Sequence, residues 1–252
     1  NLTLTLGSVS SGLQVSSALI LDNSNEWVMT GAADFVSLGS LDISDGGVIS
    51  TGGTINFSGG GQLSGTGTLD VSGSTWGLGE DFLKSSGTLT LSDTDLALSG
   101  NSKLTSNVAL SFDNLTLNDF TLTLGSSDSD LTVQNAITID TSTEGLSTGE
   151  ADLSLNSALT MSYGLLDSTG GTWEFNGDFN KTSGTLSITK TDLTLTNNIT
   201  LTSDQALNFE TLNLDLYTLT LGSSTSDLTV QNAITISQNT EGISTGDADL
   251  IL

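Results

Sequence analysis

The residues of this sequence best suited to chemistry are carboxylates, because calcium takes oxygen ligands. The candidates lie in short polar stretches between apolar residues: Asp128, Asp130, Glu144, Glu150 and Asp152, and the later set Glu241, Asp247 and Asp249. Their spacing fits neither an EF-hand loop nor the calcium-binding nonapeptide repeat. Thr225 also stands where Asp128 would recur. We therefore predict solvated turn residues and assign no metal ligand.

Paired carboxylates could also hydrolyse glycosidic bonds. Here they recur along the chain instead of gathering once, which is the wrong distribution for a single active site. The sequence has no His, Cys or Arg, so the commonest proton shuttle and the thiolate metal ligands are missing. We predict a protein that is not an enzyme, with no catalytic residue and no cofactor.

Threonines two residues apart could line a flat face that binds ice or polysaccharide. Such pairs are Thr3/Thr5, Thr88/Thr90, Thr121/Thr123, Thr194/Thr196, Thr200/Thr202 and Thr218/Thr220. However, one predicted outward series reads Thr132, Ser154, Glu174, Thr194, Asn213 and Thr229, and its Glu interrupts a regular threonine array. Because Thr also favours strands for its own sake, a ligand-binding face is kept as the alternative function.

Aromatic and lysine residues recur at equal spacing. Trp76 returns as Trp173, and we expect both to pack inside the fold rather than to display sugar-binding platforms. Lys84 and Lys181 each follow an aspartate by three residues, Asp81 and Asp178. This spacing suggests a local ion pair at a turn.

These recurrences belong to a long internal repeat. Thr121–Leu153 returns at Thr218–Leu250 with 27 of 33 positions identical, an offset of 97 residues. Near the start, Thr3–Asp22 matches Thr121–Asp140 at an offset of 118, so the first copy carries 21 additional residues, at about 23–43. We predict one solenoid over 1–252: a first copy at 1–120 with one extra rung, a second at 121–217, and the start of a third at 218–252.

The apolar residues form short alternating triplets, which predict half-buried strands. The triplets that begin at Leu131, Leu153, Trp173, Leu193, Leu212 and Leu228 advance by about 20 residues, and a second series from Ile137 keeps pace through Leu159, Phe179, Ile199, Leu219 and Ile234. Each step is the length of one rung, meaning one complete circuit of a stacked coil. We predict an all-β parallel β-helix (β-solenoid) with about 20 residues per rung and five rungs per 97-residue repeat.

The composition limits the kinds of partner that the protein can bind. A net charge of −25 repels nucleic acid and anionic membranes, and no apolar run is long enough for a membrane-spanning helix. The sequence stops in the middle of a repeat, and we expect it to be part of a longer protein.

Two glycine-rich strands, GTGTLDVSG (Gly65–Gly73) and SSGTLTLSD (Ser85–Asp93), resemble motifs of bacterial autotransporter passengers and filamentous-haemagglutinin-like adhesins. This resemblance implies a right-handed β-helix at the cell surface. We expect a non-catalytic structural component of an extracellular filament, stalk or surface adhesin in a prokaryote. Its expected partners are copies of itself end to end, further repeats of the same chain, or surface polysaccharide.

Overall fold

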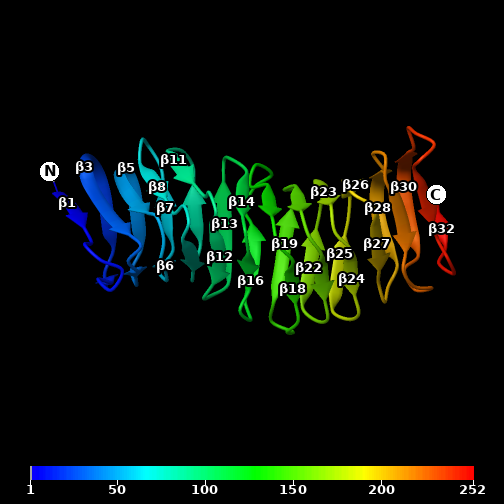
Figure 1. Ribbon diagram of the computed structural model, residues 1–252, viewed down its shortest axis with the longest axis horizontal. Helices are drawn as coiled ribbons and strands as arrows, with labels where there is room; N and C mark the ends of the chain where they lie inside the picture. Colours follow the sequence, from blue (N-terminus) through cyan, green and yellow to red (C-terminus); the bar gives the residue numbers. More distant parts are fainter. Residues whose placement is uncertain (1) are drawn as a thin grey trace. The chain divides into compact units, whose positions relative to one another are not determined.

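The computed structural model describes residues 2–252, all of whose regular elements are strands. They fall into two compact units, Asn1–Ser129 and Asp130–Leu252, which we describe separately (Figure 1). Most strands have five residues or fewer, because Thr, Ser, Asn, Asp and Gly follow the apolar triplets and favour turns. Our prediction of one continuous solenoid divided into repeat copies stays a prediction.

The first unit contains sixteen strands. They are β1 (Leu2–Thr5), β2 (Leu13–Val15), β3 (Leu19–Gly31), β4 (Phe35–Ser37), β5 (Leu41–Ser50), β6 (Thr54–Phe57), β7 (Gly61–Leu63), β8 (Thr68–Asp70), β9 (Thr75–Leu78), β10 (Phe82–Lys84), β11 (Thr88–Thr90), β12 (Asp95–Leu98), β13 (Ser102–Ser106), β14 (Leu110–Phe112), β15 (Leu115–Thr116) and β16 (Thr121–Leu124). One sheet has the order β1-β3-β5-β7-β10-β13-β16, with β8 and β11 branching from β5, and a second has β15-β12-β9-β6-β4-β2.

The second unit contains the other sixteen strands. They are β17 (Leu131–Val133), β18 (Ile137–Ile139), β19 (Gly145–Gly149), β20 (Leu153–Leu155), β21 (Leu159–Met161), β22 (Leu165–Ser168), β23 (Thr172–Phe175), β24 (Phe179–Lys181), β25 (Thr185–Ile188), β26 (Asp192–Leu195), β27 (Ile199–Thr202), β28 (Leu207–Asn213), β29 (Thr218–Leu221), β30 (Leu228–Thr235), β31 (Gly242–Ser244) and β32 (Leu250–Ile251). Their orders are β19-β22-β25, β17-β20-β23-β26-β28-β30-β32 and β18-β21-β24-β27-β29-β31.

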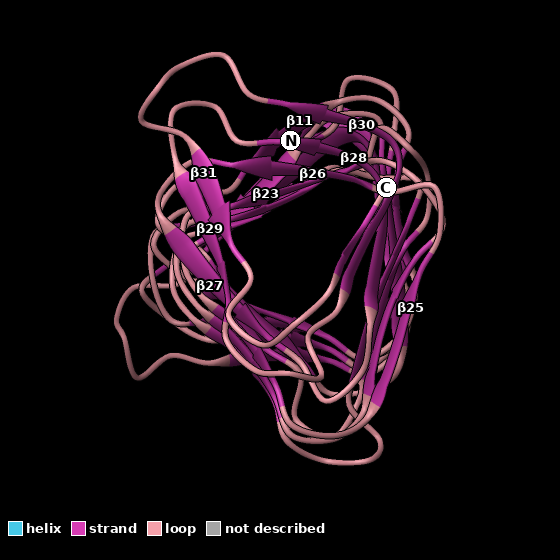
Figure 2. Cartoon of the chain, turned by 90° about the vertical axis from the view of Figure 1, so that its right-hand side faces the viewer, coloured by secondary structure: helices cyan, strands magenta, loops and turns pink. Residues whose placement is uncertain are grey.

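From β17 to β24 each strand pairs in parallel with the strand three places further along the chain, which makes these circuits of the second unit three-sided. From β26 onward the partner is two places further along, because the third side has no assigned strand after β25 in the described chain. In Figure 2 β27, β29 and β31 form one side, β26, β28 and β30 another, and β25 lies on the third. The C-terminal side faces the viewer, and β25, β26 and β27 follow one another anticlockwise, so the coil is right-handed. The predicted fold class is confirmed: the chain is a β-solenoid of about 12 rungs, spaced about 21 residues apart.

The strand register confirms most of the predicted first series and corrects its last step. Leu131, Leu153, Trp173, Leu193 and Leu212 stack in that order. The step from Leu212 to Leu228 is wrong, because Leu212 pairs with Ile234 while Leu228 pairs with Leu207 and Leu250. Strand β28 carries a register shift between Phe209 and Thr211, which sequence spacing does not reveal.

Positions related by the 97-residue repeat therefore lie in different ladders. The pairing of Leu131 with Leu153 recurs as the pairing of Leu228 with Leu250. On its other side, however, Leu228 stacks on Leu207, while the column that began at Leu131 continues from Leu212 to Ile234. The second predicted series also needs correction: Phe179 pairs with Leu201 rather than Ile199, and Leu219 pairs with Ile243 rather than Ile234. Leu131 and Leu228 thus lie in the same sheet, on β17 and β30, but in different columns of stacked residues.

The interior of each unit is filled by the inward members of the triplets. In the first unit Trp76 packs against Phe82 at a ring-centroid distance of 5.1 Å, nearly perpendicular to it. In the second, Trp173 contacts Phe175 and Phe209 at 5.7 and 6.0 Å. Such aromatic pairs add stabilisation beyond the area that they bury.

Glycine is required where adjacent rungs approach closely. Gly46 has φ +78°, and a Cβ atom there would lie 2.2 Å from the carbonyl oxygen of Glu26. Near it, Leu19 pairs directly with Leu41, so residues 19 and 41 occupy the same place in successive rungs of the first unit.

Candidate functional site

The acidic residues considered for calcium serve as hydrogen-bond acceptors for the backbone. The Glu144 carboxylate is buried and accepts hydrogen bonds from the backbone N–H groups of Asp140 and Thr141, at 2.8 and 3.3 Å. Glu241 accepts in the same way from Ser237 and also from Leu216. These carboxylates close a turn, as the capping side chains of other folds do.

A second set of acidic side chains joins one rung to the next. Asp130 accepts a hydrogen bond from the N–H of Asp152 at 3.0 Å, and Asp152 accepts from the N–H of Thr172 at 2.6 Å. Asp227 and Asp249 repeat the first of these contacts. Each carboxylate thereby satisfies a backbone donor at a corner.

Nowhere in residues 2–252 do three or more acidic side chains converge as metal ligands. Asp128 is exposed and has no hydrogen-bond partner within that range. The acidic candidates are therefore spread over separate corners, and the absence of a metal site stays a prediction.

The predicted local ion pairs of the recurring lysines are wrong. Asp81 instead accepts a hydrogen bond from the N–H of Lys103, and Asp178 accepts from the N–H of Thr200, at 2.8 and 2.7 Å. Lys84 and Lys181 lie at inward-facing strand positions and are buried. Their amines reach the following rung, where Lys84 Nζ donates to Asn107 Oδ1 at 2.6 Å and Lys181 pairs with Asp204.

The recurring tryptophans are core residues, as predicted. Trp76 and Trp173 are 0% and 1% exposed, so neither is a platform for sugars. Their indole N–H groups have no hydrogen-bond partner within the described chain. Sequence reasoning identified the burial but not this unsatisfied donor.

The outward polar residues on one side of the second unit bond to one another. Thr132, Ser154, Glu174 and Thr194 stand in register, as predicted, and Ser154 donates to the Glu174 carboxylate at 2.8 Å. The next residues in this column are Asn213 and Thr235, so the predicted Thr229 does not belong to it. The Glu174 carboxylate therefore finds one of its hydrogen-bond donors within the protein.

A different side carries hydroxyl groups without charge. We name it the hydroxyl face, formed by β18, β21, β24, β27 and β29 with the outward residues Thr138, Thr160, Asn180, Thr200, Thr202 and Thr220. None of these strands contains Asp or Glu. The six side chains make no hydrogen bond within residues 2–252, so their polar groups are available to solvent.

Register arranges the hydroxyl face in two rows. Thr138, Thr160, Asn180 and Thr202 are successive partners, and Thr200 pairs with Thr220. Parallel strands lie about 4.8 Å apart, so the groups repeat at that interval. The sequence contains the Thr-x-Thr signal, but only the structure shows which side is free of carboxylates.

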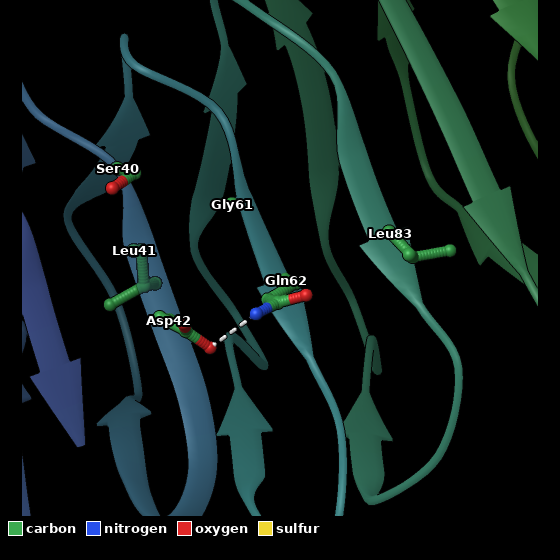
Figure 3. A pocket seen from close by; sticks show the side chains of 6 residues that line it. All are labelled: Ser40, Leu41, Asp42, Gly61, Gln62 and Leu83. Carbon is green, nitrogen blue, oxygen red and sulfur yellow. Dashed lines mark hydrogen bonds between the residues drawn. The ribbon is translucent and has the colours of Figure 1, made fainter. Parts of the chain in front are cut away.

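A shallow pocket of about 260 Å³ lies on the first unit (Figure 3). It is lined by Ser40, Leu41, Asp42, Gly61, Gln62 and Leu83. Gln62 donates a hydrogen bond to Asp42 across adjacent strands at 2.8 Å. One carboxylate held by one amide offers polar contacts but no second titratable group for acid–base chemistry.

Comparisons with known proteins give no further guide: no family model, no curated protein and no solved structure matches this chain. No helix of residues 2–252 has the length and apolar character needed to span a membrane.

Proposed function

We propose that this chain is a non-catalytic structural component of an extracellular filament, stalk or surface adhesin of a prokaryote. The observation that carries the proposal is the ladder of parallel strands that continues from rung to rung in each unit. Tension applied along such a ladder is shared among the several backbone hydrogen bonds of a rung. The glycine-rich motifs at Gly65–Gly73 and Ser85–Asp93 support the surface location by resemblance.

The chemistry of the side chains agrees with a mechanical role. A metal or catalytic site would need free carboxylates. Those of Glu144, Asp130 and Asp152 instead accept hydrogen bonds from backbone N–H groups. The remaining acidic surface keeps a repetitive protein soluble and discourages anionic partners. The proposed partners are copies of the chain or further repeats of it.

Negative-stain electron microscopy of the purified chain over a range of concentrations, with calcium or with a chelator, tests this function. Long unbranched filaments identify a polymer subunit, and discrete narrow particles of constant width identify a segment of a longer surface protein. Irregular particles that have no constant width would refute the structural role. Antibody labelling of intact source cells tests the location.

A second function is favoured by the hydroxyl face: binding to the ordered water of an ice surface. Its five threonines each present a hydroxyl and a methyl group, and the sixth residue, Asn180, presents a neutral amide, which together suit an uncharged lattice. The face has no aromatic residue for stacking on sugars, which makes polysaccharide the weaker ligand. Thermal hysteresis and inhibition of ice recrystallisation are the expected activities.

A pair of lysine substitutions tests the hydroxyl face. Thr160→Lys places a charge in the middle of the row and should abolish both activities. Thr194→Lys places the same charge on the neighbouring side, on β26, and should leave them unchanged. Absence of both activities from the unaltered protein would refute ice binding, and equal loss in both variants would refute the assignment to this face.

A further inference from the structure

The Lys84 amine lies inside the solenoid, in contact with the side-chain carboxamide of Asn107 in the next rung. The side chain is 3% exposed, and its residue pairs with Leu63 on one side and Ser106 on the other. Asn107 follows Ser106 directly, and its Oδ1 atom accepts the hydrogen bond from Lys84 Nζ at 2.6 Å. The Lys84 amine and the Asn107 carboxamide are thereby held in direct hydrogen-bond contact.

The surroundings of Lys84 shift its amine toward the neutral form, which is the nucleophilic one. An ammonium has three N–H donors to satisfy, and within the described chain Lys84 Nζ donates to Asn107 alone. Burial lowers the pKa of the Lys84 amine, because a low-dielectric interior disfavours the charged form. The neutral amine carries the lone pair that a nucleophile needs.

We propose that Lys84 and Asn107 join in an isopeptide bond that links two adjacent rungs. The Nζ lone pair attacks Cγ, and the Nζ–Cγ bond forms as the Cγ–Nδ2 bond breaks. A proton passes from Nζ to Nδ2, and the former amide nitrogen leaves as ammonia. Because Asn107 is exposed, ammonia departs directly into water, and no oxidant or second substrate is required.

The repeat supplies an internal comparison. Lys181 is the equivalent of Lys84, and it pairs with Asp204 in place of Asn107. An ion-paired ammonium has no lone pair, and a carboxylate resists nucleophilic attack. Lys181 and Asp204 therefore remain a non-covalent ion pair. The proposal concerns a covalent modification and holds whether or not the chain forms filaments.

Intact mass spectrometry of the denatured, purified chain tests the bond. The expected mass is that of the sequence minus one ammonia molecule. Digestion after lysine should fail at Lys84 and yield a branched peptide that contains both Lys84 and Asn107. The full sequence mass, with normal cleavage after Lys84, would overturn the proposal.

Three substitutions separate the bond from folding defects. Lys84→Arg should have the full mass calculated from its own sequence, with no loss of ammonia. Asn107→Asp should likewise show its full sequence mass, because it recreates the ion pair of the second copy. Asp204→Asn should create a second Lys–Asn pair and a loss of two ammonia molecules. Circular dichroism establishes that each variant is folded. A single ammonia loss in folded Asp204→Asn would overturn the claim that this pairing geometry is sufficient.

Discussion

At the scale of single residues, the two copies of the repeat differ where the backbone is strained. Leu216 has φ +80° and is 54% exposed, and its equivalent in the other copy is Asp119, at φ +70°. Left-handed conformations are costly for most L-residues and much less so for Asn and Asp. Exposed Leu216 thus sits in a conformation that suits its counterpart better.

Leu216→Asn should raise the free energy of unfolding by about 1 kcal/mol, because Asn tolerates positive φ and adds no charge. Chemical denaturation measures the change. Leu216→Val is the matched control and should destabilise, because branching at Cβ makes this region still less accessible. Equal stability of the two variants would contradict the strain argument.

The buried indole of Trp173 provides a second residue-scale prediction. Its N–H has no partner within the described chain, and leaving such a donor unsatisfied costs about 1–3 kcal/mol. Trp173→Phe removes this donor along with some packing, so it should cost much less than the roughly 3–5 kcal/mol typical of Trp→Ala. Denaturant titration of Trp173→Phe and Trp173→Ala is the measurement, and equal losses of stability in the two variants would contradict the prediction.

At the scale of strands, side-chain acceptors hold neighbouring rungs together. Asp178 accepts from the N–H of Thr200, and Asn198 accepts from the N–H of Thr218, at 2.7 and 2.8 Å. Asp and Asn therefore perform the same task in successive rungs. The backbone N–H group needs an oxygen acceptor at this position. The negative charge of Asp178 is therefore less important than its oxygen atom.

Asp178→Ala should lower the free energy of unfolding by about 1–2 kcal/mol, because the corner N–H of Thr200 loses its acceptor. Asp178→Asn should remain close to the unaltered protein. Asp128→Ala is the surface control, since Asp128 has no partner within residues 2–252. Thermal or denaturant unfolding of the three variants checks the order, and an Asn variant as weak as Ala would instead favour a role for charge.

At the scale of the whole molecule, a solenoid should tolerate the loss of a complete rung. Leu21 pairs with Ile43, so deleting residues 22–43 joins Leu21 to the residue that follows its own partner. Rung contacts are local, and stability is nearly a sum over neighbours. The shortened chain should keep its β circular dichroism and a cooperative transition.

Deleting residues 22–32 is the matched control for this prediction. It removes only part of a rung, so the following strands meet the wrong neighbours and inward residues lose their place. This variant should unfold at lower denaturant or aggregate. Comparable stability of the two deletions would contradict the idea that the rung is the unit of folding.

Local features of the sequence determined the fold class and the burial of Trp76 and Trp173. Period-2 alternation depends only on neighbouring residues, and nearly constant spacing between triplets sets the length of a rung. The ladder from Leu131 to Leu212 follows for the same reason. Prediction failed at the step to Leu228, where a register shift in β28 changes the pairing without an obvious change in composition.

What only the tertiary structure decided are the relations between rungs. The partners of Lys84 and Lys181 lie 23 residues further along the chain, whereas the sequence suggested aspartates three residues away. The carboxylate-free hydroxyl face likewise emerges only when register is known. Both depend on how turns of unequal length place a side chain against the next rung, and that placement is fixed by the stacking of the whole coil.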